Sequence, residues 1–161
     1  MAEVDINVEL GQWLMRYRRA LRDVGVKLAD VIVEIWKKTA TDKSIGPHVL
    51  PLFTTGQYTN SIQRIVEIRD DGISIEVFPT VSYAEKLEKG TSDVSYSDIE
   101  RWAELKSQIY GGPIDPQSVF KAIKKRGGTL PTPISDYVGE RIEKLDFEAL
   151  IDIILEQAGL L

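Results

Sequence analysis

The sequence has no cysteine, a single histidine and no long apolar run. Without cysteine, disulfides, thiolate zinc sites and a cysteine nucleophile are all excluded. No apolar stretch approaches the roughly 20 residues that cross a bilayer, and the first residues are acidic where a signal peptide would be basic. We therefore expect a protein that is made and assembled in a cytoplasm, without a membrane partner.

Groups that could carry catalysis are also scarce. His48 has no second metal ligand at a suitable spacing, and no Gly-x-Ser-x-Gly turn supplies a nucleophile for it. The glycine pairs at 111–112 and 127–128 lack the Lys-Ser/Thr sequence of a phosphate-binding loop. We interpret His48 as a structural or surface residue. The sequence predicts a protein that is not an enzyme, with no catalytic residue, metal or cofactor.

The totals are those of an ordinary globular chain. Its 161 residues are 43% hydrophobic and 28% charged, which fits one self-sufficient domain covering residues 1–161. The net charge of −5 argues against broad nucleic-acid binding, because phosphate contacts need an excess of lysine and arginine. A local basic face is still compatible with this charge.

Residues 55–91 contain the strongest periodic signal. Apolar residues alternate with others along 62–68 and 73–77, so each segment predicts a strand with one apolar face. Between them, residues 70–72 (Asp-Asp-Gly) tolerate the positive φ that a tight antiparallel turn requires. Pro79 is expected to end the second strand, because it has no N–H for the ladder.

A short helix is expected after this hairpin. Ser82 can cap its start, and Tyr83, Ala84 and Leu87 share one face of it. Gly90 is expected to end it in the left-handed conformation.

Two short motifs flank the hairpin in order. The first is Thr55-Gly56-x-x-x-x-Ser61-Ile62, and the second is Tyr83-Ala84-x-x-Leu87-Glu88-x-Gly90-Thr91. Together they resemble the tail-component family of tailed bacteriophages, small proteins at the head–tail junction or the top of the tail that are described as tail-completion or head–tail joining proteins. Tyr58 departs from the aliphatic residue usual in that family. Thr132-Pro133-Ile134 keeps only part of its Pro-aromatic-Leu signature.

This resemblance implies a structural virion protein. Copies of the chain, six by expectation, would close into a ring at the head–tail junction or tail top. Portal-side, neck or tail proteins would be its neighbours, and DNA would pass through the lumen without sequence-specific binding. Within the motif, Glu88 would anchor the end of the short helix or accept a bond from a neighbouring subunit.

Residues 5–38 predict the longest helix. Its apolar stripe, with spacings of three and four residues, is Leu10, Leu14, Tyr17, Leu21, Val24, Leu28, Val31 and Ile35. We interpret it as an amphipathic helix lying across the apolar face of the hairpin, in preference to a coiled coil. Gly25 costs about 1 kcal/mol relative to alanine inside a helix, so it marks either a close contact or a slight bend.

Basic residues form two clusters. Arg16, Arg19 and Arg22 lie near one another at helical spacing, and the cluster is either a solvated face or a surface for an acidic neighbouring subunit or passing DNA. Residues 121–126 form the second cluster near a helix end, where cations are favoured in any case. These clusters support the alternative hypothesis of a nucleic-acid-binding module. An enzyme is a more distant third.

Two apolar segments are candidates for assembly contacts. In the connection at residues 39–54, the apolar residues are Val49, Leu50, Leu52 and Phe53. They are too apolar for a free loop and are expected to pack on the domain or on a neighbouring subunit. The C-terminal segment 149–161 is similarly apolar, so it either docks on the core or contacts another subunit.

Further helices are expected near residues 96–110 and 116–126, and in a last stretch whose apolar positions run from residue 134 to residue 155. Ser95 or Ser97 can cap the first, Asp115 before Pro116 the second, and Asp146 can divide the last into two. The sequence thus predicts a single α+β domain. A small, mainly antiparallel sheet would be packed by the long N-terminal helix and by several C-terminal helices.

Overall fold

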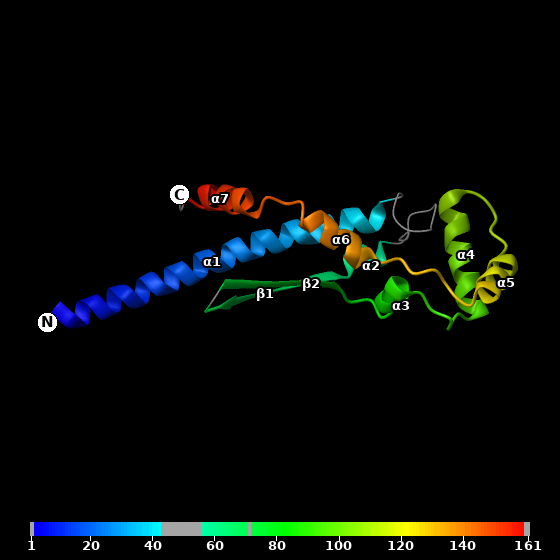
Figure 1. The fold of residues 1–161 in the computed structure, drawn as a ribbon, viewed down its shortest axis with the longest axis horizontal. Coiled ribbons are helices and arrows are strands. Elements are labelled where there is room, and N and C mark those ends of the chain that lie inside the picture. The colour runs from blue at the N-terminus through cyan, green and yellow to red at the C-terminus, as the bar shows by residue number, and fades with distance from the viewer. Residues whose placement is uncertain (1, 43–55, 71, 160–161) are drawn as a thin grey trace. The chain divides into compact units, whose positions relative to one another are not determined.

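The computed structural model describes residues 2–42, 56–70 and 72–159, and among them the side chains of residues 14–42, 56–70, 72–108 and 111–159. The fold is α+β, as predicted. The elements are α1 (Ala2–Thr41), α2 (Gln57–Asn60), β1 (Ile62–Arg69), β2 (Gly72–Pro79), α3 (Ala84–Lys89), α4 (Tyr96–Tyr110), α5 (Pro116–Arg126), α6 (Ile134–Ile142) and α7 (Phe147–Gln157) (Figure 1). Strands β1 and β2 form a two-stranded sheet.

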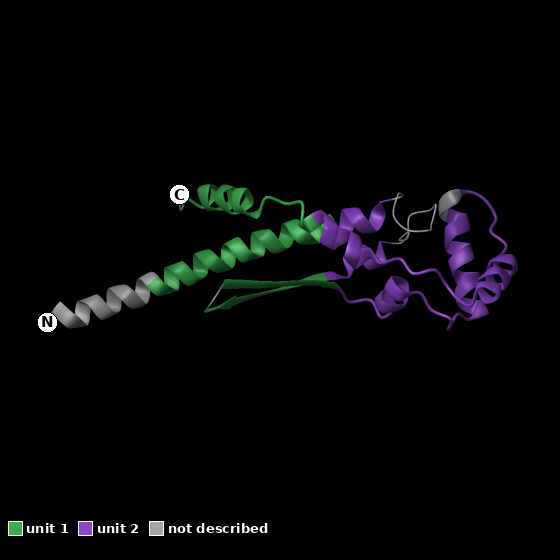
Figure 2. Ribbon diagram, in the orientation of Figure 1, with its two compact units in different colours: residues 1–35, 63–78, 142–161 green, residues 36–62, 79–141 purple. Residues whose placement is uncertain are grey.

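The chain forms two compact units (Figure 2). Residues 1–35, 63–78 and 142–161 make the first, called here the hairpin unit because it holds most of both strands, together with much of α1 and with α7. Residues 36–62 and 79–141 make the second, called the helical unit. The expectation of one domain stays a prediction.

The β-hairpin of the first unit confirms the alternation read from the sequence. Gly72 has a φ of 153° at the turn, and β2 ends at Pro79 as expected. Ile73 and Ile75 on the apolar face of β2 pack against buried Val24 and Leu28 of α1. Helix α1 therefore packs part of its apolar stripe against the sheet.

Gly25 is the point of closest approach between α1 and the sheet. A Cβ atom on Gly25 would lie 2.7 Å from Val66 Cγ1 and 2.8 Å from Ile73 Cγ2, inside van der Waals contact. Of the two interpretations of this glycine, the close contact is confirmed. An ion pair from Arg64 Nε to Asp30 Oδ1, at 2.8 Å, also joins β1 to α1.

Helix α7 completes this core. The Asp146 side chain accepts a hydrogen bond from Ala149 N at 3.0 Å, so the aspartate begins a separate last helix as its spacing suggested. Ile154 is buried with Val24 and Leu28, and Leu150, Ile151 and Leu155 pack against this cluster. The C-terminal segment thus docks on its own core along the described part of α7.

The expected stripe on α1 is wrong at its N-terminal end. Leu14 and Tyr17 are 48% and 51% exposed, whereas Val24 and Leu28 are buried. The helical spacing places all four on one face, but burial requires a neighbour opposite that face. Among the described residues, that neighbour covers the helix well only from Val24 onward.

Local capping signals define the ends of α4 and α5 in the helical unit. Ser95, rather than Ser97, caps α4 by accepting a bond from Asp98 N at 3.2 Å. Asp115 accepts bonds from the amides of residues 117 and 118 ahead of Pro116, as predicted for α5. Gly111 and Gly127 end the two helices in the left-handed conformation.

The core of this helix pair is small and apolar. Buried Val94, Ile99 and Ile123 form it, and Val119 and Phe120 pack against them. The Phe120 ring also meets Tyr96 edge-on, with ring centroids 5.6 Å apart.

The start of α3 corrects the predicted cap. Tyr83 occupies the N-cap position, and no side chain caps the helix, so the expectation for Ser82 is wrong. The Ala84 amide donates to the Val81 carbonyl, and this turn removes Ser82 from the extended conformation that a capping residue needs. Gly90 has the expected positive φ of 72°, but its ψ of 170° is extended rather than left-handed helical.

Candidate assembly site

The second motif holds a segment that comes some forty residues later in the chain. The Glu88 carboxylate accepts bonds from Ser135 N at 3.0 and 3.3 Å and from Ser135 Oγ at 2.9 Å. Ser135 lies in the first turn of α6, where backbone N–H groups have no partner within the helix and negative charge is favoured. The contact that the structure describes for Glu88 is therefore within the chain, and it joins the end of α3 to the start of α6.

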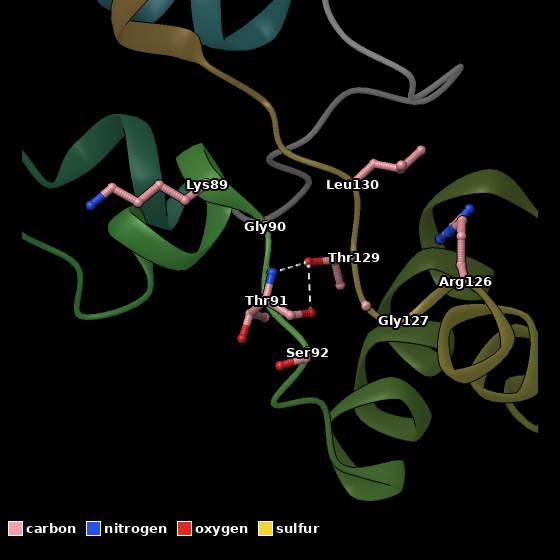
Figure 3. A pocket seen from close by; sticks show the side chains of 9 residues that line it. Lys89, Gly90, Thr91, Ser92, Arg126, Gly127, Thr129 and Leu130 are labelled. Atoms are coloured by element: carbon pink, nitrogen blue, oxygen red, sulfur yellow. Dashed lines mark hydrogen bonds between the residues drawn. The ribbon is translucent and has the colours of Figure 1, made fainter.

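Thr91 pairs with Thr129 next to this cap. Thr129 N donates to Thr91 O at 2.8 Å. The Thr129 hydroxyl accepts a bond from Thr91 N at 2.9 Å and donates to Thr91 O at 3.4 Å (Figure 3). On the other side of Gly90, Thr132 N donates to Leu87 O at 2.9 Å. Residues 87–91 and 129–135 are therefore joined by a series of backbone and side-chain bonds, which we call the motif junction.

Two glycines make the motif junction possible. A Cβ atom on Gly90 would lie 2.5 Å from Thr129 O, and one on Gly128 would lie 2.5 Å from Thr91 O. Both glycines have positive φ, of 72° and 147°. Because the obstructing atoms belong to the backbone, no rotamer change could make room for a larger residue.

A recess of about 270 Å³ lies beside the motif junction. It is lined by Lys89, Gly90, Thr91, Ser92, Arg126, Gly127, Gly128, Thr129 and Leu130. Its two cations do not converge, because the Lys89 side chain runs away from Arg126 (Figure 3) and pairs with Glu85 at 2.8 Å. Helices α3 and α5 end at this recess, and helix C-termini disfavour anions. The recess is thus a by-product of the chain crossing rather than a phosphate site.

Tyr58 of the first motif is buried near the charged and phenolic groups of the second motif. It is fully buried, and its hydroxyl accepts a bond from Trp36 Nε1 at 3.2 Å. Burial raises the pKa of Tyr58 to about 12; the Trp36 bond opposes this rise, and nearby Glu88 and Tyr83 add to it. Tyr58 was noted in the sequence only as a departure from an aliphatic residue. An aromatic side chain with a polar tip fits here because Trp36 supplies the donor.

The first motif closes the base of the hairpin. Ser61 O accepts bonds from Thr80 N at 3.1 Å and from Thr80 Oγ1 at 2.9 Å. Gly56, with a φ of 70°, precedes α2, a short helix that the sequence pattern did not predict, and Ile62 is buried. Thr55 lies outside the described residues.

The remaining residues of the second motif have simpler positions. Tyr83 is the N-cap of α3, and burial raises its pKa. Ala84 is the first residue of that helix. The structure therefore gathers the described residues of both motifs into the helical unit.

Of the other predicted assembly residues, the structure describes only the arginines. Arg16, Arg19 and Arg22 are exposed on α1. Arg16 and Arg19 contribute to the rim of a groove of about 230 Å³, which is also lined by Ala20, Asp23, Val24, Lys27, Ile154 and Ala158. Val49, Leu50, Leu52, Phe53 and the histidine at 48 lie outside the described residues.

Sequence reasoning missed one further connection within the helical unit. Arg141 on α6 donates from Nη1 to Thr39 Oγ1 at 3.0 Å and from Nη2 to the Asp42 carboxylate. Thr39 is fully buried, and Arg141 is one partner of its hydroxyl, as a buried polar group requires. A separation of about one hundred residues leaves no local signal for this contact.

The part of the chain that the structure describes contains no group of three or more histidine, cysteine, aspartate or glutamate residues able to hold a metal ion. In the same part, no helix is long and apolar enough to cross a membrane. Comparison with protein-family models, with curated proteins and with solved structures found no match to this chain.

Proposed function

We propose that this chain is a structural subunit of a tailed-phage particle, acting in tail completion or head–tail joining. Several copies, six by expectation, form a ring at the head–tail junction or tail top, and DNA passes through its lumen. The chain acts by binding its neighbours and catalyses no reaction.

The observation that carries this proposal is the motif junction. Three positions of the second motif have a physical reason: Glu88 caps α6, Gly90 permits a close backbone crossing, and Thr91 pairs with Thr129. The end of the second motif therefore acts as one folded feature. This coherence favours a structural resemblance over a coincidence of single letters.

The surface gives a second line of support. On α1, Leu14, Met15 and Tyr17 are each about half exposed or more, as is Ile153 on α7. Large exposed apolar side chains interspersed with charge are typical of a surface that binds other proteins.

Two measurements test the proposal. Negative-stain images of the purified chain are expected to show rings with a central channel. Gold-labelled antibody against the chain is expected to mark the head–tail junction of particles from the host that carries its gene, with antibody against the capsid as a control for labelling. Absence of the chain from purified particles would contradict the proposal.

A nucleic-acid-binding module is the second candidate. The exposed Arg16, Arg19 and Arg22 on α1 favour it, because arginine contacts phosphates readily. A gel shift of duplex DNA that weakens steeply with salt would support this function, whereas unchanged mobility at low salt would remove it.

A further inference from the structure

The segment of α1 at residues 14–19 is exposed along its whole length. All six consecutive side chains are classed as exposed, and six residues of an α-helix extend through more than one full turn. They include Leu14 at 48%, Met15 at 69% and Tyr17 at 51% exposure. A helical segment with this much exposed apolar surface calls for a partner.

The same segment is strongly basic. Arg16, Arg18, Arg19 and Arg22 are exposed, and none of the four forms an ion pair with another described residue. We call residues 14–22 the basic segment. It combines apolar side chains with positive charge in a chain whose net charge is −5, so a complementary surface must combine apolar side chains with negative charge.

The outer face of α7 has this complementary character. Glu148, Asp152 and Glu156 are exposed at spacings of four residues, and Ile153 beside them is 50% exposed. The helix contains no lysine, arginine or histidine. We call residues 148, 149, 152, 153 and 156 the acidic face.

We propose that the basic segment of one copy docks on the acidic face of α7 in a second copy. This inference rests on the ring-forming function proposed above and names its contact surfaces. The two patches differ, so the association is head-to-tail, which closes into a ring when the rotation between copies permits. The groove beside Arg16 and Arg19 has an apolar floor and a mainly basic rim. It offers a recess for an apolar side chain flanked by carboxylates, such as Ile153.

A second copy fits the basic segment better than DNA does. Phosphates would satisfy the arginines but would leave Leu14, Met15 and Tyr17 in water. The acidic face of α7 would repel DNA, whereas it is complementary to the basic segment both in charge and in exposed apolar side chains.

Charge reversal on each surface tests this contact in the full chain. The first variant is Arg16→Glu/Arg19→Glu, whose two arginines line the groove, and the second is Asp152→Lys/Glu156→Lys, beside Ile153. Sedimentation velocity over a concentration series is expected to show self-association of the parent chain. Each variant alone is expected to associate at least tenfold more weakly, because like charges then face each other.

A mixture of the two variants gives the sharpest result. Each variant keeps one intact surface, and the two reversed surfaces are opposite in charge to each other, so mixing the two variants is expected to restore association that each lacks alone. Restored association also shows that both variants are folded. Lys121→Glu/Lys125→Glu on the exposed side of α5 makes the same charge change as the α1 variant and is expected to leave association unchanged.

Three outcomes would overturn the inference. They are a parent chain that stays monomeric throughout the series, variants that associate as strongly as the parent, and a salt-dependent DNA shift lost in Arg16→Glu/Arg19→Glu without any self-association. The proposed function is judged separately, by labelling at the head–tail junction. Rings that persist in both variants would therefore refute these surfaces while leaving the ring-forming function in place.

Discussion

Replacing Gly90 with alanine tests whether the motif junction depends on close backbone approach. At a φ of 72° and a ψ of 170°, Gly90 occupies a region that other residues rarely adopt, and strain of this kind costs about 1–3 kcal/mol. The new Cβ would also lie 2.5 Å from Thr129 O, so the two segments would have to separate. Separation weakens the bonds between Thr91 and Thr129, of which the two shorter ones contribute about 1 kcal/mol each. We expect Gly90→Ala to lower the free energy of unfolding by about 3–5 kcal/mol.

Gly111 provides the matched control. It also ends a helix with positive φ, at 71°, but a Cβ atom there would meet no atom within 4 Å. Gly111→Ala should therefore cost only the left-handed strain, about 1–2 kcal/mol. Urea denaturation followed by helical circular dichroism measures both variants against the parent chain. Equal losses would refute the argument, because the obstructing carbonyl would then contribute nothing.

Three further substitutions test other parts of the structure. Gly25→Ala should lower the free energy of unfolding by about 1–2 kcal/mol, because overlap with branched side chains of the sheet outweighs the gain in helix propensity. Gly139→Ala, with open space around the new Cβ atom, should raise the free energy of unfolding by about 1 kcal/mol. A gain at both sites would argue against close helix–sheet contact. Glu88→Ala should cost about 1–2 kcal/mol in urea denaturation through the lost cap of α6. Glu85→Ala breaks only an exposed ion pair and should cost clearly less. Equal costs would refute the capping role. The raised pKa of Tyr58 means that the folded state holds the phenol proton more tightly than the unfolded state does. The resulting stabilisation of the folded state is fully present below pH 10 and is lost as the pH rises toward 12. Tyr58→Phe should therefore flatten the fall in stability over this range, and an unchanged slope would count against a buried, protonated phenol.

Features that depend on a few adjacent residues could be predicted from the sequence. The caps at Ser95, Asp115 and Asp146 involve amides two or three positions away, and the hairpin follows from strand alternation around a turn that contains Gly72. Gly25 was also informative, because an unfavourable residue inside a helix needs a compensating reason. Ser82 misled because a turn at the start of α3 placed Tyr83 in the capping position.

Burial along α1 could be predicted only in part. The spacing of apolar residues correctly gave the face that meets the sheet, from Val24 to Leu28. The spacing gave no indication of where along α1 the packing of other elements ends. Leu14 and Tyr17 were therefore expected in the core and are instead exposed. Periodicity specifies a direction around the helix axis, whereas burial depends on which other element reaches that position.

The sequence by itself determined the hairpin, the two motifs and every helix except the short α2, because propensity, capping and turn chemistry act over a few residues. Only the tertiary structure decided what the motif residues contact. Glu88 meets Ser135, Thr91 meets Thr129, and Arg141 meets Thr39 across separations of 47, 38 and 102 residues. Such partners are selected by the packing of the whole unit, where each buried polar group needs a bond and each close crossing needs a glycine, and no local pattern in the chain encodes that pairing.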